Sequence, residues 1–460
     1  ILIAIFCLEN HLALSEYCYV DDRNPFLLFS TKTAYEHVHG TITDSKLPNC
    51  EPLQIWMILR HGTRNSGKHW IKKLKNDLPQ IQRTIIENHD NCKLCEKDFN
   101  RLKDWNGYKP LQKKKAARLT MQGKQDMFFL GLRFKNYFPE LFQSRSNNDL
   151  DKLYQFRSTK TQRTIASMEN FIKGLFNNVT FDNAKIVGIP EDTLLQMYKM
   201  CDSWDNEYNN VSYEEVIAFE ESEDFRNLVE NVSRRLGFLY IPKDSILTMY
   251  DMCRYEKAWT VTQLSPWCAV FSKEELHVLE YREDLYYYYK AGYGREINAR
   301  LGCTLLQDMM NHFWKMEQED ESNQPKGVFY FSDTISLLNL LTTLNINKDQ
   351  MQLKAFNYKE MAKRQWRTSF MSSFAANLIA VFYKCDTISQ PNKVMFYLAE
   401  KLVMIDGCDV GLCDWEYIKQ KFNPVLKQCD MKTCWNENGV PIFLPNFVLL
   451  ILSCFSLIFI

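Results

Sequence analysis

The sequence has no excess charge of either sign, because 56 lysines and arginines balance 56 aspartates and glutamates. This balance gives no general attraction to nucleic acid, so any site for an anion must be a local cluster of cations. Glycine and proline are scarce, at 16 and 14 of 460 residues, which excludes a collagen-like chain. The remaining composition, 46% apolar and 24% charged, is that of a globular protein with a sizeable core.

The start of the chain predicts entry into the secretory pathway. An apolar run from Ile1 to Leu8 is followed by small residues up to Ser15. Without an initiator methionine or a basic start, we interpret residues 1–15 as a signal peptide truncated at its beginning; a buried N-terminal strand is the alternative. Fifteen cysteines fit an oxidised, secreted enzyme better than a reduced cytosolic one. Three sequons predict glycosylation at Asn178, Asn210 and Asn231.

The end of the chain predicts attachment to a membrane. No charge occurs from Phe447 to Ile460. As a helix this tail would measure about 21 Å, less than the roughly 30 Å of a bilayer's hydrocarbon core. Small residues and a short spacer precede it, which is typical of a GPI-anchor signal over residues 436–460; an apolar membrane tail is the alternative. Either way, residues 16–435 form the folded domain, outside the cell or at its surface.

Several of the thirteen cysteines between these two ends stand close together in the sequence. Local disulfides are expected for Cys92–Cys95, Cys253–Cys268, Cys408–Cys413 and Cys429–Cys434. A Cys-x-x-Cys pair can also bind zinc or carry redox chemistry, but no second pair with histidine partners follows. No metal is therefore expected, and the pairing as a whole stays open.

Strand-like and helix-like patterns alternate along the chain. Residues 53–59 and 328–331 are short apolar runs rich in β-branched and aromatic residues, which predicts two buried strands. This alternation with long helices indicates a layered α/β core with flanking helices. The polar stretch of about 180–255 predicts a smaller, mostly helical inserted subdomain. Apolar spacing predicts helices over 122–138, 306–314 and 337–344.

The first predicted strand runs directly into Arg60-His61-Gly62-Thr63-Arg64. Ligands bind at the carboxyl ends of strands in open α/β sheets. A neutral imidazole can attack phosphorus to form a phosphohistidine, and guanidinium groups on either side can bind the phosphoryl oxygens. The alternative is a basic surface loop.

This string matches the signature Arg-His-Gly-x-Arg, and the chain resembles the histidine acid phosphatases, in particular their multiple inositol polyphosphate phosphatase branch. The likeness covers residues 18–413. It includes the segments Leu119-Thr120-Met121-Gln122-Gly123, Ser265-Pro266-Trp267-Cys268 and Trp366-Arg367-Thr368. The resemblance implies the histidine phosphatase fold and no metal or other cofactor.

The resemblance also implies residue roles. His61 matches the nucleophile, and Arg60 and Arg64 match the arginines that bind the phosphate. Arg163 matches a third phosphate-binding arginine.

One functional position departs from the family pattern. After the late strand the family has a histidine that binds phosphate and then a carboxylic acid that protonates the leaving oxygen, whereas this chain has Ser332-Asp333-Thr334-Ile335. An ungapped match places Asp333 at the histidine position, and a slip of one residue places it at the acid position. We take Asp333 as the proton donor. The alternative is a weakened or inactive family member that acts as a surface binding protein.

A substrate with many phosphates needs further cations in its pocket. Lys68 follows the motif and is a candidate, although a solvated helix face is the alternative. We therefore expect a secreted or cell-surface phosphomonoesterase that hydrolyses inositol polyphosphates through phospho-His61. A broad-specificity acid phosphatase is a further alternative. Membrane contact is expected only through the C-terminal tail, and no nucleic-acid partner is expected.

Overall fold

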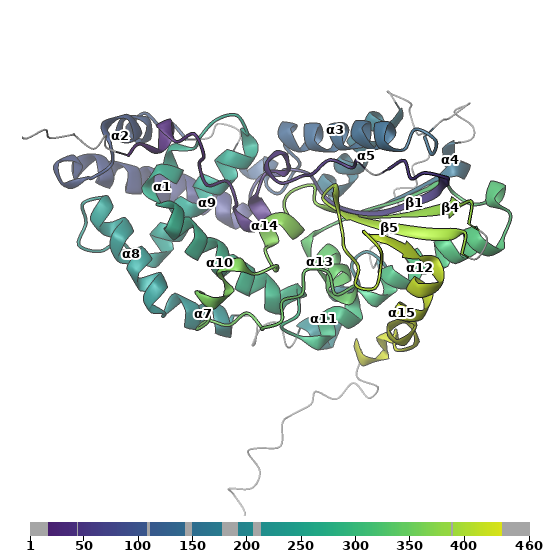
Figure 1. Ribbon diagram of the computed structural model, residues 1–460. Helices are drawn as coiled ribbons and strands as arrows, with labels where there is room; N and C mark the ends of the chain where they lie inside the picture. Colours follow the sequence, from purple (N-terminus) through teal and green to yellow (C-terminus); the bar gives the residue numbers. More distant parts are fainter. Residues whose placement is uncertain are drawn as a thin grey trace, which may run out of the picture.

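The computed structural model describes residues 17–43, 45–107, 111–142, 150–176, 192–205, 213–387 and 390–434. They form a central sheet with helices on both faces and a helical region beside it, which confirms the expected α/β fold (Figure 1). Within these ranges, no helix has the length and apolarity needed to cross a membrane. The predicted signal peptide, the C-terminal tail, Asn178 and Asn210 lie outside the described residues.

The sheet has the strand order β2-β3-β1-β4-β5-β6, and β7 pairs with β5. Strands β2, β3 and β1 are parallel, whereas β4 and β5 continue the sheet in antiparallel fashion. Because parallel strands end at one edge, Arg60 at the end of β1 lies beside Ser332 at the end of β3. The strands are β1 (Cys50–Arg60), β2 (Tyr154–Ser158), β3 (Gly327–Ser332), β4 (Asn377–Cys385), β5 (Asn392–Leu398), β6 (Lys401–Leu402) and β7 (Leu412–Asp414).

Side chains of β1 alternate between two cores, as expected for a central strand. Met57 and Leu59 pack in the core that α3 and α5 cover, while Trp56 and Ile58 pack in the core that α12, α13 and α15 cover. Figure 1 shows these two helix layers on opposite faces of the sheet. The three helices and two strands predicted from apolar spacing are confirmed. The layer helices are α3 (Met121–Tyr137), α5 (Gln162–Phe176), α12 (Cys303–Gln318), α13 (Thr334–Thr343) and α15 (Trp415–Lys427).

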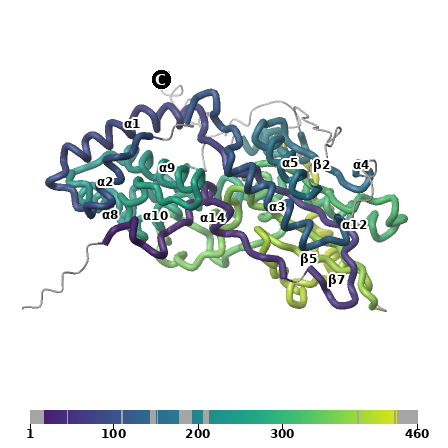
Figure 2. Tube along the Cα trace, turned by 90° about the horizontal axis from the view of Figure 1, so that it is seen from above, coloured from purple at the N-terminus to yellow at the C-terminus, as the bar shows by residue number. Residues whose placement is uncertain are grey.

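A helical region lies beside the sheet, and Figure 2 shows α1 along its outer side. Helices α7, α8 and much of α9 come from the segment predicted as a subdomain, while α1, α2 and α10 come from outside it. Asn231 is exposed on α8. The helices of this region are α1 (Lys68–Glu87), α2 (Glu96–Lys103), α7 (Glu214–Glu220), α8 (Glu223–Arg235), α9 (Lys243–Trp259) and α10 (Lys273–Ala291). The short helices elsewhere are α4 (Leu150–Leu153), α11 (Glu296–Leu301) and α14 (Thr368–Met371).

Disulfides join distant parts of the chain. The predicted local bridges Cys253–Cys268 and Cys408–Cys413 are confirmed. The others within the described residues are Cys18–Cys95, Cys50–Cys385, Cys201–Cys434 and Cys303–Cys429.

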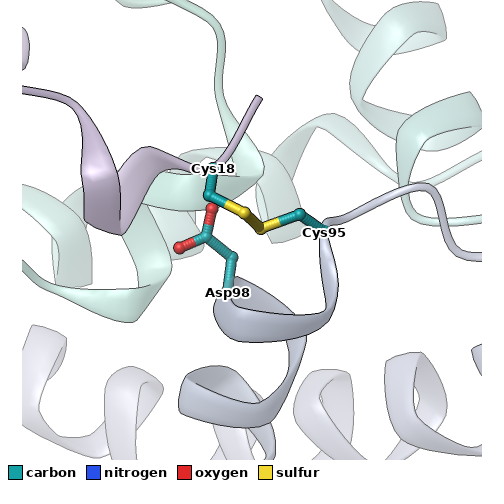
Figure 3. A group of neighbouring side chains, drawn as sticks. All are labelled: Cys18, Cys95 and Asp98. Atoms are coloured by element: carbon teal, nitrogen blue, oxygen red, sulfur yellow. A yellow bond between two sulfur atoms is a disulfide. The ribbon is translucent and has the colours of Figure 1, made fainter. Parts of the chain in front are cut away.

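The predicted Cys92–Cys95 bridge is wrong. Cys95 is the N-cap of α2 and pairs with Cys18, which is 77 residues away in the sequence (Figure 3). The carboxylate of Asp98, one turn further along α2, accepts a hydrogen bond of 2.5 Å from the backbone N–H of Tyr19. This bond holds the N-terminal segment across the start of α2, where Cys18 of that segment pairs with Cys95. Cys92 is left as a free thiol.

The predicted Cys429–Cys434 bridge is also wrong. Cys429 pairs with Cys303 at the start of α12, and Cys434 pairs with Cys201, which follows the 3₁₀ helix η7 (Met197–Met200). Helix α15 packs against α12, so the chain that follows α15 returns to segments 126 and 233 residues earlier. Packing between helices therefore overrides proximity in sequence.

Helices α3 and α5 cross at two glycines. A Cβ atom on Gly131 of α3 would lie 2.3 Å from the carbonyl oxygen of Phe171. A Cβ atom on Gly174 of α5 would lie 2.1 Å from that of Phe128. Both distances are far inside van der Waals contact, so the backbones approach this closely only without side chains. Both helices contact the loop that follows β1, so this crossing also positions that loop.

Replacing Gly174 with alanine should destabilise the protein. Alanine is the better helix former by about 1 kcal/mol. Its methyl group would nevertheless push the two helices apart, and overpacking typically costs about 1–3 kcal/mol, and more where the opposing atom belongs to the backbone. We expect Gly174→Ala to lower the midpoint of thermal unfolding. Lys173→Ala, at an exposed position of the same helix, should leave the midpoint nearly unchanged. An unchanged midpoint for Gly174→Ala would contradict a tight crossing.

Candidate active site

The motif loop, which runs from Arg60 to Arg64, is held against α3 and α5. A Cβ atom on Gly62 would lie 2.4 Å from a backbone carbonyl oxygen of α3, so glycine is required there. The carboxylate of Asp126 on α3 accepts hydrogen bonds from the N–H of Thr63 (3.0 Å) and from its hydroxyl (2.7 Å). The N–H of Gly62 donates to the hydroxyl of Ser167 on α5 (3.1 Å). Two helices therefore determine the shape of the loop.

His61 presents a nitrogen lone pair in this loop. The residue is only 2% exposed. Its Nδ1 lies 2.9 Å from the backbone carbonyl oxygen of Gly62. Because a carbonyl oxygen can only accept, Nδ1 carries the proton, and in the neutral ring Nε2 keeps an unshared electron pair. That pair is what a nucleophile requires.

Burial and neighbouring positive charge keep the ring neutral. Burial first, and then the guanidinium groups of Arg60, Arg64 and Arg163, lower the pKa of His61 well below its ordinary value. The imidazole therefore stays unprotonated in mildly acidic solution, where a free imidazole would be charged. The structure thus brings the predicted nucleophile and all three predicted phosphate-binding arginines together.

Arg60 is anchored by backbone carbonyls rather than by a carboxylate. Its Nη1 donates to the carbonyl oxygens of Thr31 (2.6 Å) and Ser372 (2.7 Å). Its guanidinium carbon lies 4.8 Å from the centre of the Phe374 ring. Burial is the main cause that lowers the pKa of Arg60 to about 9, so the guanidinium still carries its charge at neutral pH. This arrangement fixes the position of the charge without neutralising it.

All three arginines carry a buried donor without a partner. The Nε–H groups of Arg60, Arg64 and Arg163 are buried and form no hydrogen bond. No carboxylate of the described residues lies within ion-pair distance of these guanidiniums. Buried donors are normally satisfied and buried charges are normally paired. An anion with several oxygens, such as a phosphate group, would meet both requirements.

Asp333 lies at the same sheet edge as His61. It follows Ser332 at the end of β3, as His61 follows Arg60 at the end of β1, and these strands are parallel neighbours. The N–H of His61 donates to the carbonyl oxygen of Ser332 (3.2 Å). Asp333 therefore comes next to the nucleophile through the topology of the sheet, in either of the two sequence registers.

Every hydrogen bond of the Asp333 carboxylate within the described residues is one that it accepts. Oδ1 accepts from the backbone N–H groups of Ile335 (3.1 Å) and Ser336 (3.4 Å), so that Asp333 is the N-cap of α13. Oδ2 accepts from the hydroxyl of Tyr198 (2.6 Å) and from Nε2 of Gln196 (3.1 Å). Burial and the Asp333 charge raise the pKa of Tyr198 well above its ordinary value, so the phenol keeps its proton and donates.

A cavity of about 460 Å³ opens beside the motif loop. Five cationic and two acidic side chains line it, together with five aromatic ones. Its net charge of about +3 suits a ligand with several negative charges. The charged and aromatic lining residues are Lys32, Arg64, Arg163, Arg254, Arg282, Asp251, Glu283, Trp70, Tyr213, Tyr255, Tyr286 and Tyr287.

Lys68, the predicted additional cation, is not among the lining residues and is exposed at the start of α1. The cations that line the cavity instead are Lys32, Arg254 and Arg282, which the sequence patterns did not indicate. They lie on the 3₁₀ helix η2 (Ser30–Lys32), on α9 and on α10. These elements are distant from the motif in sequence, and no local pattern marks their cations as ligands.

Comparison with known proteins places the chain in a family. The model of the histidine phosphatase superfamily (branch 2) matches residues 53–398. The chain is 36% identical over 431 residues to multiple inositol polyphosphate phosphatase 1 of Drosophila melanogaster, across 90% of this chain and 89% of that protein. It is 29% identical to the human protein of the same name, across 87% of each chain.

Solved structures show the same fold. The phytase from D. castellii superimposes with a TM-score of 0.68 at 18% identity, covering 87% of this chain and 85% of that one. The Bifidobacterium longum multiple inositol polyphosphate phosphatase, in complex with inositol hexasulfate, gives a TM-score of 0.63 at 13% identity, covering 86% and 97%. With the family model spanning most of the described sheet, the chain belongs to the histidine phosphatase superfamily, branch 2, and is a histidine acid phosphatase.

Proposed function

We propose that this enzyme hydrolyses inositol polyphosphates through a phosphohistidine on His61. The relatives from Drosophila melanogaster and human are named as multiple inositol polyphosphate phosphatases, and the first of them aligns with 90% of the chain. The excess of cations in the cavity supports a polyanionic substrate independently. The observation that carries the proposal is the neutral imidazole surrounded by three guanidiniums, each with a buried Nε–H that has no acceptor and none with a carboxylate of the described residues within ion-pair distance.

In the first step, Nε2 of His61 attacks the phosphorus atom, and the bond from phosphorus to the ester oxygen breaks. The guanidiniums of Arg60, Arg64 and Arg163 bind the phosphoryl oxygens and stabilise the charge that they carry in the transition state. The leaving oxygen takes a proton from the carboxylic acid of Asp333 and departs as an alcohol. The product is a phosphohistidine and an Asp333 carboxylate.

In the second step, water attacks the phosphorus of the phosphohistidine. The bond from phosphorus to nitrogen breaks, and its electron pair returns to Nε2 of His61. The Asp333 carboxylate takes the proton that the water loses, which restores the acid for the next cycle. Tyr198, Gln196 and the first turn of α13 hold this carboxylate beside the nucleophile throughout. Inorganic phosphate then leaves.

The nucleophile is tested by His61→Ala. Without the imidazole no phosphoenzyme can form, so turnover of inositol hexakisphosphate should fall by at least about 1,000-fold. The three arginines remain, so inositol hexasulfate, which is not hydrolysed, should still bind. Because the pKa of His61 is lowered, the wild-type nucleophile should remain competent from pH 7 to about pH 5. Substantial turnover by His61→Ala, or wild-type protein inactive on every phosphate ester, would contradict the proposal.

The proton donor is tested by Asp333→Asn. Asparagine caps a helix as well as aspartate does, so α13 should keep its start, but the amide cannot donate the required proton. The kcat for inositol hexakisphosphate should fall by about 10²–10⁴-fold. The burst of p-nitrophenol that accompanies formation of the phosphoenzyme should fall much less, because this leaving group needs no proton and the burst precedes the attack of water that both substrates share. Equal losses of phosphoenzyme formation with both substrates would argue against the acid role, and a gain of activity in Asp333→His would place Asp333 at the histidine position instead.

We also propose that the enzyme acts outside the cytosol, in the secretory pathway or at the cell surface. The six disulfides of the described residues support an oxidising compartment. Asn231, a predicted glycosylation site, is accessible on α8.

Glycosylation gives a direct test of this compartment. Treatment of the cellular protein with peptide N-glycosidase should increase its mobility on a denaturing gel. The Asn231→Gln variant should migrate ahead of the wild type by one glycan, whereas Asn170→Gln, outside any sequon, should not. Protein that the glycosidase leaves unchanged would count against passage through this pathway.

A further inference from the structure

One cation of the cavity, Lys32, is only loosely paired with a carboxylate and lies outside the group of three arginines that act on His61. Arg254 and Arg282 both pair closely with the carboxylate of Glu283, at 2.8 and 3.0 Å. The remaining lining cations have no carboxylate of the described residues within hydrogen-bond distance. These remaining cations are Arg64 and Arg163, which both act on His61, and Lys32.

Lys32 uses only one of its three hydrogen-bond donors within the described residues. Its ammonium group bonds the hydroxyl of Thr31 at 3.1 Å and lies 3.8 Å from the nearest carboxylate oxygen, on Glu283. An ammonium group has three donors, so two remain for a ligand. The side chain is 14% exposed and lines the cavity, so a ligand there can reach it.

Lys32 lines the cavity, whereas His61 is not among the residues that line it. The strongest charge effects on His61 come from the three arginines around it. Those on Lys32 come mainly from the helical region, through α9 and α10. The charged groups that act on Lys32 are Arg254, Glu283, Asp251 and Arg64. A ligand that contacts both His61 and Lys32 must therefore extend from the motif loop into the cavity.

We propose that Lys32 binds a second phosphate group of the substrate while the first reacts at His61, and so selects inositol polyphosphates over simple monoesters. A phosphate at this point supplies the acceptors that the ammonium group lacks. A small monoester fills only the site around His61 and gains nothing from Lys32. This inference rests on the proposed function and deepens it.

Binding of a polyphosphate at Lys32 should depend on pH. Burial and the Arg254 charge lower the pKa of Lys32 to about 7 in the empty site. A bound phosphate would raise that pKa, so protonation of Lys32 and binding of the polyphosphate favour each other. The contribution of Lys32 to binding is therefore complete below pH 7 and is lost as the pH rises through and above 7. Arginine at this position would keep its charge over the whole range.

The test compares Lys32→Met with Lys173→Met, a matched change at an exposed position of α5. For Lys32→Met we expect KM for inositol hexakisphosphate to rise about tenfold to hundredfold, the range of a hydrogen bond to a charged group. Its kcat, and its KM for p-nitrophenyl phosphate, should change less than about twofold, because the reacting phosphate does not contact Lys32. Lys173→Met should match the wild type on both substrates.

The pH arm uses Lys32→Arg. In the wild type, KM for inositol hexakisphosphate should increase between pH 6 and pH 8.5, beyond any change seen with p-nitrophenyl phosphate. Lys32→Arg should keep the low KM across this interval. An equal rise of KM for both substrates in Lys32→Met, or an unchanged KM for inositol hexakisphosphate, would overturn the proposal.

Binding separates this inference from the proposed function. Calorimetric titration with inositol hexasulfate needs no turnover, and Lys32→Met should weaken its binding while leaving that of inorganic sulfate unchanged. If the wild type hydrolyses neither ester, the proposed function fails, and the titration still decides the role of Lys32. Equal affinity of wild type and Lys32→Met for inositol hexasulfate would refute that role.

Discussion

The site depends on largely buried positive charge that has no carboxylate of the described residues within ion-pair distance. Arg60, Arg64 and Arg163 surround His61, and no carboxylate of the described residues neutralises them. This arrangement costs stability, because a buried charge normally requires a partner. It has two chemical consequences: it keeps the imidazole neutral, and it leaves the guanidiniums free for an anion. A bound phosphate group would supply the counter-charge and the hydrogen-bond acceptors that these guanidiniums lack.

A second set of buried charges keeps that cluster in position. On α10, Asp284 accepts hydrogen bonds from Arg364 (2.9 Å) and from the N–H of Thr368 (2.8 Å), at the start of α14. Ser372 caps the end of α14, and its carbonyl oxygen accepts a hydrogen bond from Nη1 of Arg60. Burial raises the pKa of Asp284, while Arg364 favours its ionised form. The helical region therefore helps to position Arg60 through α14, as well as lining the cavity.

Local patterns predicted the parts of the fold that neighbouring residues determine. The apolar run of β1 and the apolar spacing of α3 act within a few residues, so both strands and the helices were predicted from the sequence. Arg163 was placed only through the family resemblance, because no local feature distinguishes it. Lys68 follows the motif in sequence but points to no cavity, since α1 begins by turning its first residues to solvent.

Contacts between residues far apart in the sequence could not be predicted, because the topology of the fold brings these residues together. Lys32 meets Glu283 because η2 packs against α10, and Cys434 meets Cys201 because the chain after α15 returns to η7. In both cases the contact joins segments more than 200 residues apart, and neither has a short-range signature. The local bridge Cys408–Cys413 was predictable because a tight turn alone brings its cysteines together.

The charge of Asp333 acts on the arginines at the same sheet edge. As a carboxylate it raises the pKa of Arg60 and Arg163 against the effect of burial. In the proposed cycle this group is a neutral acid when the phosphate binds and becomes a carboxylate only after the leaving oxygen has taken its proton. The first step therefore places no carboxylate charge of Asp333 against the incoming phosphate, and the carboxylate forms when a base is needed for water.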